Sequence, residues 1–258
     1  MVLHMLLTGK KGLVLNVTNK NSIGWAIADR ANQEGAVVGV GAQNERLLEG
    51  ALKLVEGRER FDTFTIDFGF EEQFDKLAEE VKAKYGTIDF VVHSVGYAPK
   101  EALTGRFIDT NLEDFQVAMN ASAYSLVRLC RAMEPLLNDD GSVITLSYLG
   151  STRVASNYKV MGMCKAALEA GIRYLALELG ERGIRVNTVS PGPVNTISGR
   201  GVQGLTQMIG HVQSVSPLRR PYGQQEAAGA ALYLLSDLSQ GVTGQIIFVD
   251  SGYNILAM

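Results

Sequence analysis

The fold of this chain is decided close to its start, by the stretch GLVLNVTNKNSIGWAIA at residues 12–28. Its first part is a largely apolar run typical of a β-strand, and from Ser22 onward the apolar spacing is that of a helix. The turn between them is polar and is not a GxGxxG loop. This unit predicts the first crossover of a parallel α/β sheet, where N–H groups at the helix start can bind a diphosphate. Ser22 is also explained as a simple helix N-cap.

The same alternation of strand and helix continues along the whole chain. Strands are expected at 12–17, 36–40, 61–66, 88–93, 142–147, 184–189 and 245–249, and helices near 24–34, 44–55, 71–85, 111–137, 157–181 and 225–236. Seven strands with six helical crossovers predict one doubly wound, Rossmann-like α/β domain over residues 1–258, with a seven-stranded parallel sheet flanked by helices on both faces. The irregular stretch of about 191–217 is long for a loop in a compact domain, which indicates a functional segment.

The composition excludes several classes of protein. Of 258 residues, 46% are hydrophobic and 20% are charged, as in ordinary globular proteins. The formal net charge of -3 supplies no positive field for nucleic acid or an anionic membrane. We find neither a signal peptide nor an apolar run of the ~20 residues that span a membrane. Two cysteines and three histidines suit neither a disulfide framework nor a Cys/His zinc site. We expect a cytoplasmic protein with no metal, no nucleic acid and no membrane partner.

The residues after the second, third and fourth expected strands are candidates for nucleotide contact, because doubly wound sheets bind ligands at the carboxyl ends of their strands. Gln43 lies where an acidic residue often binds the ribose 2′-hydroxyl. Arg46 could meet a 2′-phosphate, but a solvated helix charge explains it better. Asp67 and Phe68 could lie along the adenine, although Asp67 is also explained as a capping residue. Gly96 would let the backbone approach the cofactor.

Two tyrosines and a lysine follow the fifth expected strand, at Tyr148, Tyr158 and Lys165. Tyr158 and Lys165 are seven residues apart, so on the helix expected over 157–181 both face one way, about 10.5 Å apart along the axis. A ligand that lies along the helix could contact both. The spacing alone also allows a tyrosine at the core edge and a surface lysine. His93, at the end of the fourth strand, is interpreted as a packed residue.

The pattern Tyr148-x9-Tyr158-x6-Lys165 resembles the enoyl-acyl-carrier-protein reductases of bacterial fatty-acid synthesis, a divergent branch of the short-chain dehydrogenase/reductases. The Tyr-x6-Lys spacing is the specific element, because ordinary members of the superfamily have Tyr-x3-Lys, and here that position is Gly162. The resemblance covers essentially the whole chain, through matches at residues 22–23, 93–99, 122–125, 146–150, 185–187, 192–193, 217–220 and 249–253.

The resemblance implies hydride transfer from NADH, with NADPH the lesser alternative, to the β-carbon of a trans-2-enoyl thioester on acyl carrier protein. Tyr158 would donate a hydrogen bond to the thioester oxygen, Lys165 would bind the nicotinamide ribose, and Tyr148 would line the acyl pocket or aid proton delivery. Residues of about 191–217 would form the substrate-binding loop. The protein would assemble as a homotetramer. The implied cofactor contacts are Asn16, Ser22, Ile23, Gln43, Asp67, Phe68, Ser94, Val95, Gly96, Lys165, Val194 and Thr196, and the implied substrate contacts are Tyr97, Ala98, Tyr148, Tyr158 and Met161.

Some positions depart from the family pattern. Asn16 stands where the family has glycine, although asparagine tolerates positive φ. Asn120 and Thr145 occupy the places of catalytic residues of ordinary superfamily members, and a β-strand threonine explains Thr145 better. Pro191 and Asn195 are unusual before the substrate loop.

Two other functions stay open. One is a ketoacyl reductase, for which Tyr-x3-Lys is expected. The other is a non-catalytic dinucleotide sensor, which has no need of the tyrosine–lysine pair.

Overall fold

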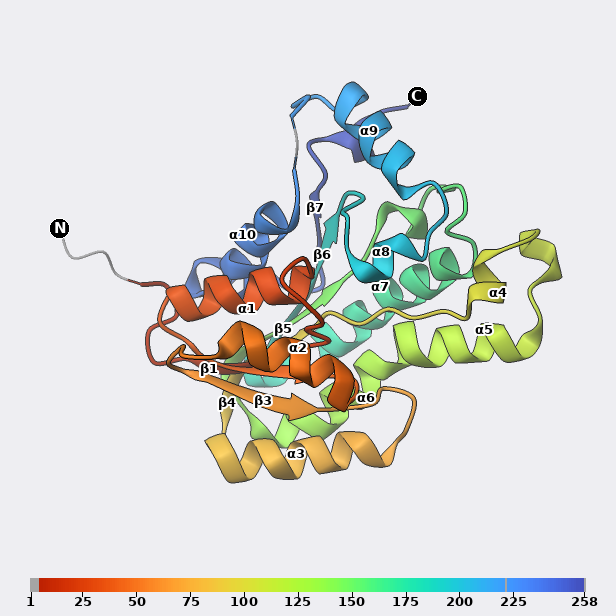
Figure 1. Ribbon diagram of the computed structural model, residues 1–258. Helices are drawn as coiled ribbons and strands as arrows, with labels where there is room; N and C mark the ends of the chain where they lie inside the picture. Colours follow the sequence, from red (N-terminus) through yellow and green to blue (C-terminus); the bar gives the residue numbers. More distant parts are fainter. Residues whose placement is uncertain (1–4, 221, 258) are drawn as a thin grey trace.

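A parallel sheet forms the centre of the computed structural model, which describes residues 5–220 and 222–257. The seven strands run in the order β3-β2-β1-β4-β5-β6-β7, with helices on both faces (Figure 1). The predicted single doubly wound domain is therefore confirmed, and the strand order reverses between β1 and β4. The strands are β1 Lys11–Leu15, β2 Val37–Ala42, β3 Phe61–Thr65, β4 Ile88–His93, β5 Leu137–Leu146, β6 Arg185–Pro191 and β7 Ile246–Val249.

Capping side chains fix where the first helices begin. The Ser22 side chain accepts a hydrogen bond from the N–H of Trp25, and Asn44 accepts one from Leu47 in the same way. No helix in the described part of the chain is long and apolar enough to span a membrane. The α-helices are α1 Ile23–Gln33, α2 Glu45–Val55, α3 Glu72–Tyr85, α4 Lys100–Leu103, α5 Leu112–Met119, α6 Ser125–Met133, α7 Val160–Leu179, α8 Ile197–Arg200, α9 Leu205–Val215 and α10 Gln224–Leu235.

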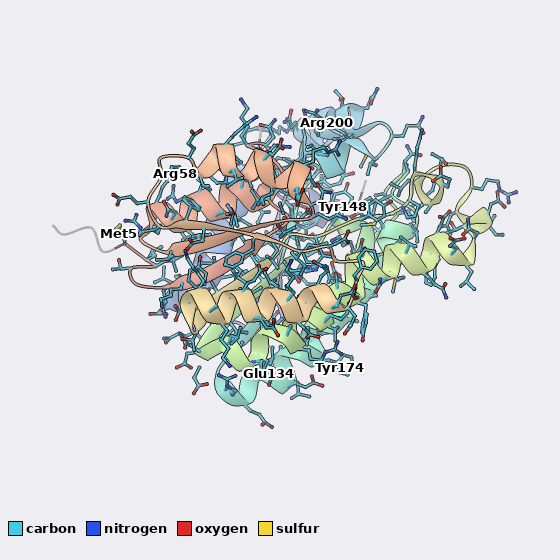
Figure 2. The ribbon with its side chains drawn as sticks, turned by 60° about the horizontal axis from the view of Figure 1, so that its bottom comes forward. Met5, Arg58, Glu134, Tyr148, Tyr174 and Arg200 are labelled. Carbon is cyan, nitrogen blue, oxygen red and sulfur yellow. The ribbon has the colours of Figure 1, made fainter. Side chains whose placement is uncertain are left out.

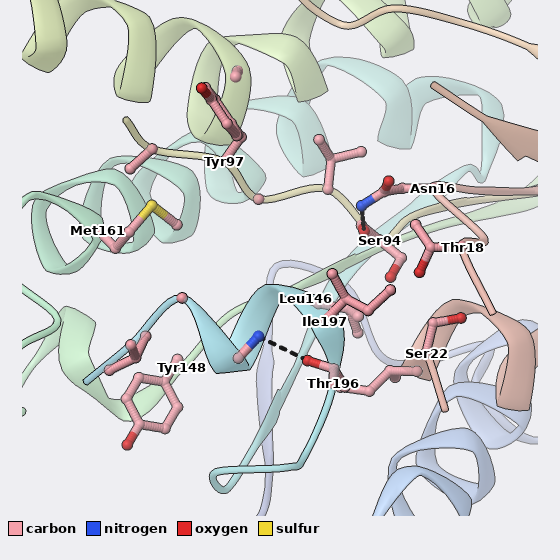
Figure 3. Close-up of a pocket in the computed structure, with 18 of the residues that line it drawn as sticks. Asn16, Thr18, Ser22, Ser94, Tyr97, Leu146, Tyr148, Met161, Thr196 and Ile197 are labelled. Atoms are coloured by element: carbon pink, nitrogen blue, oxygen red, sulfur yellow. Dashed lines mark hydrogen bonds between the residues drawn. The ribbon is translucent and has the colours of Figure 1, made fainter. Parts of the chain in front are cut away.

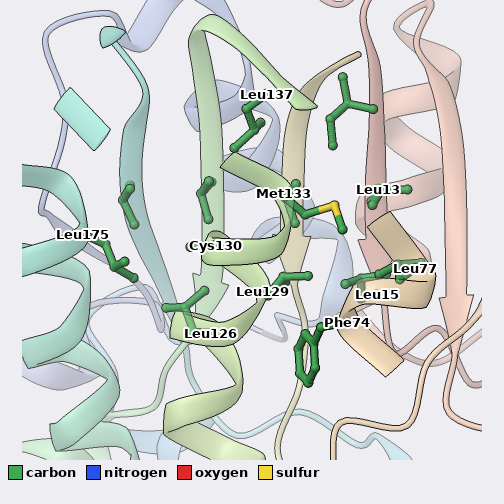
Figure 4. Close-up of a cluster of buried hydrophobic side chains, with 14 of the residues drawn as sticks. Leu13, Leu15, Phe74, Leu77, Leu126, Leu129, Cys130, Met133, Leu137 and Leu175 are labelled. Carbon is green, nitrogen blue, oxygen red and sulfur yellow. The ribbon is translucent and has the colours of Figure 1, made fainter. Parts of the chain in front are cut away.

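Alternating side chains of each strand enter two hydrophobic cores, one on each face of the sheet. On β1, Leu13 and Leu15 point into the core covered by α3, α6 and α7, whereas Val14 points into the core covered by α1 and α10. Figure 4 shows the first of these cores, in which apolar side chains of α3 and α6 pack against the strands. Because both faces are covered, the central strands are apolar nearly throughout, as the sequence predicts.

The helix expected over 111–137 is not α-helical throughout. α5 passes into a π-helical turn, Asn120–Tyr124, before α6 begins, and β5 starts at Leu137 rather than at residue 142. A π turn accommodates an extra residue without ending the helix, so the apolar spacing does not reveal it. The early start of β5 comes from a pairing of Ile88 with Leu137, after which the register of the two strands shifts.

α7 begins at Val160 and not at residue 157. Asn157 and Lys159 have φ angles of 64° and 43°, in the left-handed region that a right-handed α-helix excludes. Tyr158 therefore lies in the turn before the helix, and the expectation that it shares a helix face with Lys165 is wrong. The irregular stretch of about 191–217 holds the short helices α8 and α9.

Candidate active site

A cavity of about 720 Å³ opens at the carboxyl ends of the strands, beside the point where the strand order reverses between β1 and β4 (Figure 3). Doubly wound sheets bind nucleotides at this position. The structure brings every residue that the sequence nominated for cofactor or substrate contact to the wall of this cavity, namely Asn16, Ser22, Ile23, Gln43, Asp67, Phe68, Ser94, Val95, Gly96, Tyr97, Ala98, Tyr148, Tyr158, Met161, Lys165, Val194 and Thr196.

The end of the cavity beside α1 is suited to an anion. Asn16 has a φ of 62°, and its side-chain N–H donates to the Ser94 carbonyl at 2.9 Å, which joins the ends of β1 and β4. Asparagine thus keeps the turn in which the family has glycine. Ser22 caps α1 and also lines the cavity, so both interpretations of this residue hold. The N–H groups of Ile23 and Gly24 begin the helix without intrahelical partners, and with the helix dipole they favour phosphate.

Polar side chains line the part of the cavity at the ends of β2 and β3. Asp67 Oδ1 accepts hydrogen bonds from the backbone N–H of Gly69 at 2.9 Å and from Gln43 Nε2 at 3.5 Å. Asp67 therefore makes the local capping contact and still lies in the wall, next to Phe68. Arg46 is exposed, as expected of a solvated helix charge, yet it also borders the cavity.

Lys165 is a buried cation in the cavity wall, with 5% of its surface exposed. Its Nζ donates to the carbonyl of Leu146 at 2.7 Å and to that of Val95 at 3.3 Å. An ammonium group has three N–H donors, so one remains for a ligand. Burial lowers the pKa of Lys165 to about 8, which leaves the group mainly protonated near neutral pH. The alternative of a surface lysine is excluded.

Tyr148 and Tyr158 meet edge to face, with ring centroids 4.8 Å apart. Burial raises the pKa of Tyr148 to about 12 and also raises the pKa of Tyr158, so both phenols stay neutral and can donate hydrogen bonds. Two glycines make room for this arrangement. A Cβ on Gly150 would lie 2.5 Å from the Tyr158 ring, and a Cβ on Gly162 would lie 2.8 Å from the Gly150 carbonyl oxygen.

The wall formed by Tyr97 and Ala98 depends on residues for which the sequence predicted no role in the site. Ser122, fully buried in the π turn, donates to the Tyr97 carbonyl at 2.7 Å and accepts from the Tyr97 N–H at 2.8 Å. It thereby fixes the backbone that leads to Ala98. An apolar helix pattern cannot distinguish a side chain that faces a cavity from one that faces the core. Wall residues missed for this reason are Leu103, Val117 and Ala121. Thr18, Leu146 and Ser147, which lie near the ends of β1 and β5, were also missed.

His93 lies behind the wall and is fully buried. Its Nδ1 is 2.9 Å from Thr145 Oγ1, and its Nε2 is 2.9 Å from Ser125 Oγ. Burial, together with the positive charge of Lys165, lowers the pKa of His93 to about 3, so the imidazole is neutral. His93 and Thr145 are therefore the packed residues that the sequence suggested. Over residues 5–220 and 222–257, no group of three or more His, Cys, Asp or Glu side chains could hold a metal ion.

Comparison with known proteins supplies independent information on the family. The sequence model of the protein family described as Enoyl-(Acyl carrier protein) reductase matches residues 17–254 of this chain. An NADH-dependent enoyl-acyl-carrier-protein reductase of Rickettsia bellii (strain RML369-C) is 44% identical over 251 residues, which cover 97% of this chain and 96% of the relative.

Solved structures of such reductases share the whole fold. The Bacillus cereus enzyme with NADP+ and indole naphthyridinone superposes with a TM-score of 0.95 at 39% identity, covering 98% of this chain and 99% of the other. The Anaplasma phagocytophilum enzyme in complex with NAD has a TM-score of 0.93 at 39% identity, with coverage of 98% and 95%. This chain therefore belongs to the enoyl-acyl-carrier-protein reductase family.

Proposed function

We propose that the chain catalyses the NADH-dependent reduction of trans-2-enoyl thioesters carried by acyl carrier protein, a step of fatty-acid elongation. The observation that carries this proposal is the meeting of Tyr148, Tyr158 and Lys165 at one cavity, in a chain of this family. The relative from R. bellii is named for the same cofactor and the same carrier protein.

The residues of the wall fit a nicotinamide dinucleotide. The first turn of α1 offers N–H donors to the diphosphate, and Lys165 offers its remaining N–H to the nicotinamide ribose. Gln43 offers an amide to the adenosine ribose. NADH is favoured over NADPH because the charge of Glu45 repels a 2′-phosphate, against the attraction of the neighbouring Arg46. When bound, NADH supplies the hydride that the substrate accepts.

The protein's own residues orient the substrate and stabilise the charge that develops on it. As the β-carbon accepts the hydride, negative charge builds up on the thioester oxygen. The neutral phenol of Tyr158 donates a hydrogen bond to that oxygen, and Lys165 adds a positive field. Protonation at the α-carbon completes the reduction. Tyr148 contacts the Tyr158 ring and lines the acyl pocket beside it.

The acyl chain lies, in this proposal, between the wall made by Tyr97, Ala98 and Met161 and the substrate-binding segment of about 191–217. Apolar side chains of that segment line the same cavity as Met161. They can cover an acyl chain and exclude water from the site of hydride transfer. The cavity-facing apolar residues of the segment are Val194, Ile197, Val202, Leu205 and Met208.

The packing of Gly162 argues against the alternative of a ketoacyl reductase. A lysine of the Tyr-x3-Lys motif would stand at residue 162, where a Cβ would lie 2.8 Å from the Gly150 carbonyl oxygen. A non-catalytic sensor would use Lys165 to bind the dinucleotide, but it would have no use for the neutral phenols of Tyr148 and Tyr158 in the cavity wall.

A turnover assay tests the proposal and separates it from both alternatives. Purified protein is mixed with NADH and either crotonyl thioester or acetoacetyl thioester, and the loss of NADH absorbance is followed. We expect turnover of the enoyl thioester. Turnover of the ketoacyl thioester alone would identify a ketoacyl reductase, and NADH binding without turnover of either would identify a sensor.

The same assay measures cofactor preference. We expect a higher kcat/KM with NADH than with NADPH. A preference for NADPH of more than about tenfold, or 1.4 kcal/mol, would show that Arg46 governs the 2′ position and that Glu45 does not.

We also propose that the chain acts in the cytoplasm as a homotetramer. Apolar side chains are exposed on the outer surface of α7. Tyr174 is 71% exposed (Figure 2), and Leu177 is 76% exposed. Such residues on neighbouring turns suit contact with another copy of the chain. Light scattering should give the mass of four chains, and the mass of one chain would contradict the tetramer. Cell fractionation tests the location.

A further inference from the structure

A buried carboxylate lies one helical turn beyond Lys165 on α7, and the mechanism above does not use it. Glu169 exposes only 4% of its surface. A carboxylate is costly to bury unless it is hydrogen-bonded and its charge is compensated. Its Oε1 accepts a hydrogen bond from Ser147 Oγ at 2.5 Å, and Ser147 itself lines the cavity. Glu169 therefore lies directly behind the wall of the active site.

Lys165 and Glu169 are bound to adjacent residues at the end of β5. Lys165 Nζ donates to the carbonyl of Leu146 at 2.7 Å, and Glu169 accepts from the hydroxyl of Ser147. Side chains at positions i and i+4 lie on the same face of a helix, with about 5–6 Å between their Cβ atoms. A positive and a negative side chain thus leave α7 side by side and contact the same strand end.

The other titratable groups packed around Lys165 are neutral near pH 7. Burial lowers the pKa of His93 to about 3, so its imidazole is unprotonated. Burial raises the pKa of Cys164 to about 11 and raises the pKa of Tyr158, so the thiol and the phenol keep their protons. Among these groups, Glu169 supplies the negative charge that compensates the ammonium of Lys165.

We propose that Glu169 is a positioning residue, whose carboxylate, held by Ser147, keeps Lys165 protonated and in place for the cofactor ribose. The inference rests on the proposed function, in which Lys165 binds that ribose. Burial lowers the pKa of Lys165 to about 8, and two neighbours, Cys164 and the carboxylate of Glu169, oppose this effect. Without that charge, the lysine would lose its proton closer to neutral pH.

The pH dependence of NADH binding tests this role. The dissociation constant is measured by NADH fluorescence from acid to alkaline pH for the wild type and for Glu169→Gln, which can still accept a hydrogen bond from Ser147 but has no charge. Wild-type affinity should fall as pH rises past about 8. In Glu169→Gln the fall should begin about 1 pH unit lower. The same pH dependence in both proteins would overturn the proposal.

Two further variants separate charge from structure. Glu169→Asp keeps the charge with a shorter side chain and should keep the wild-type pH dependence, even if its overall affinity is lower. Glu178→Gln removes an exposed carboxylate from the same helix and should change nothing. If Glu169→Gln does not fold, as judged by circular dichroism, Glu169→Asp decides, and a shifted pH dependence in that variant would overturn the proposal.

These measurements distinguish a failure of the role proposed for Glu169 from a failure of the proposed function. If the wild type binds NADH but reduces no enoyl thioester, the proposed reaction is wrong, while the pH dependence of binding still tests Glu169. If the wild type reduces enoyl thioesters and Glu169→Gln shows no shift, only the role of Glu169 is wrong. If the wild type binds no NADH, both proposals fall.

Discussion

The two walls of the cavity are built in different ways. The nucleotide wall consists of strand ends, such as Asn16 after β1 and Gln43 after β2, whose positions follow from the register of the sheet. The substrate wall consists of turns and short helices that side chains hold in place. Asn157, for example, donates from Nδ2 to the Gln203 carbonyl at 3.0 Å, which links the turn before α7 to the segment between α8 and α9.

This difference assigns separate tasks to the two walls. In doubly wound sheets the ligand binds at the carboxyl ends of the strands, where the strand order reverses. The choice of substrate then depends on irregular segments, which can change without disturbing the sheet. Variants in the substrate wall should therefore impair turnover, whereas variants in the nucleotide wall should impair binding of the cofactor.

Tyr158→Phe should have the largest effect, and it should act on turnover. The variant removes the hydrogen-bond donor proposed for the thioester oxygen, which should lower kcat by about 10²–10³. The dissociation constant for NADH should stay near that of the wild type. Steady-state kinetics with crotonyl thioester measure the first quantity, and fluorescence titration measures the second.

Tyr148→Phe is the matched control for this prediction, because it removes the neighbouring phenol and leaves the ring pair in contact. Its loss of kcat should be smaller. A variant pair in which Tyr148→Phe is the more damaged enzyme would reverse the roles given to the two tyrosines.

Lys165→Ala should show the opposite behaviour, with its main effect on cofactor binding. The variant removes a charge-assisted hydrogen bond to the ribose, worth about 1.5–3 kcal/mol, so the dissociation constant for NADH should rise about 10- to 150-fold. That rise should exceed the rise in Tyr158→Phe. Equal dissociation constants in the wild type and Lys165→Ala would contradict the role given to the lysine.

His93 should make folding stability depend on pH, because it lies behind the nucleotide wall and is neutral in the folded state. Its folded-state pKa is about 3, and the unfolded value is near 6.5. Between these values the unfolded chain binds a proton that the folded chain does not, so stability falls as pH drops below 6.5. At pH 5 this costs the folded state about 2 kcal/mol relative to neutral pH.

Urea unfolding of the wild type and His93→Asn, at pH 7.5 and at pH 5, measures this contribution. The variant should be the less stable protein at pH 7.5, because Thr145 and Ser125 lose their ring partner. The gap between the two proteins should narrow by about 2 kcal/mol at pH 5. A gap that does not change with pH would mean that His93 is protonated in the folded protein.

The sequence predicts the nucleotide wall far better than the substrate wall, for physical reasons. Strand ends are visible as the ends of apolar runs, so Gln43 and Asp67 could be placed from pattern alone. The turn around Tyr158 could not, because Asn157 and Lys159 have positive φ angles that only the folded environment enforces. The π turn that carries Ser122 is equally hidden, since its residues suit an ordinary helix.

The smallest expected effect is a change in how fast trypsin cleaves the segment from residue 195 to residue 213 when ligands bind. The segment holds Arg200, an exposed site for trypsin at the end of α8 (Figure 2). The helix around it has only four residues, and Arg200 Nε bonds to Asn195 Oδ1 within the same segment at 2.9 Å. Such a short helix, with Gly199 inside it and Gly201 directly after it, is held weakly and should open in the free protein.

Trypsin should cleave after Arg200 in the free protein, and more slowly when oxidised cofactor and a tight ligand of the acyl site are both present. The bound acyl ligand would give Ile197, Val202 and Leu205 an apolar surface to cover, so the segment would close over it and exclude water. Arg200→Gln is the control, since its fragment pattern should lack this cut in both states. Equal cleavage after Arg200 with and without the ligands would show that α8 and α9 form a fixed helical pair, and that the substrate wall is as rigid as the nucleotide wall.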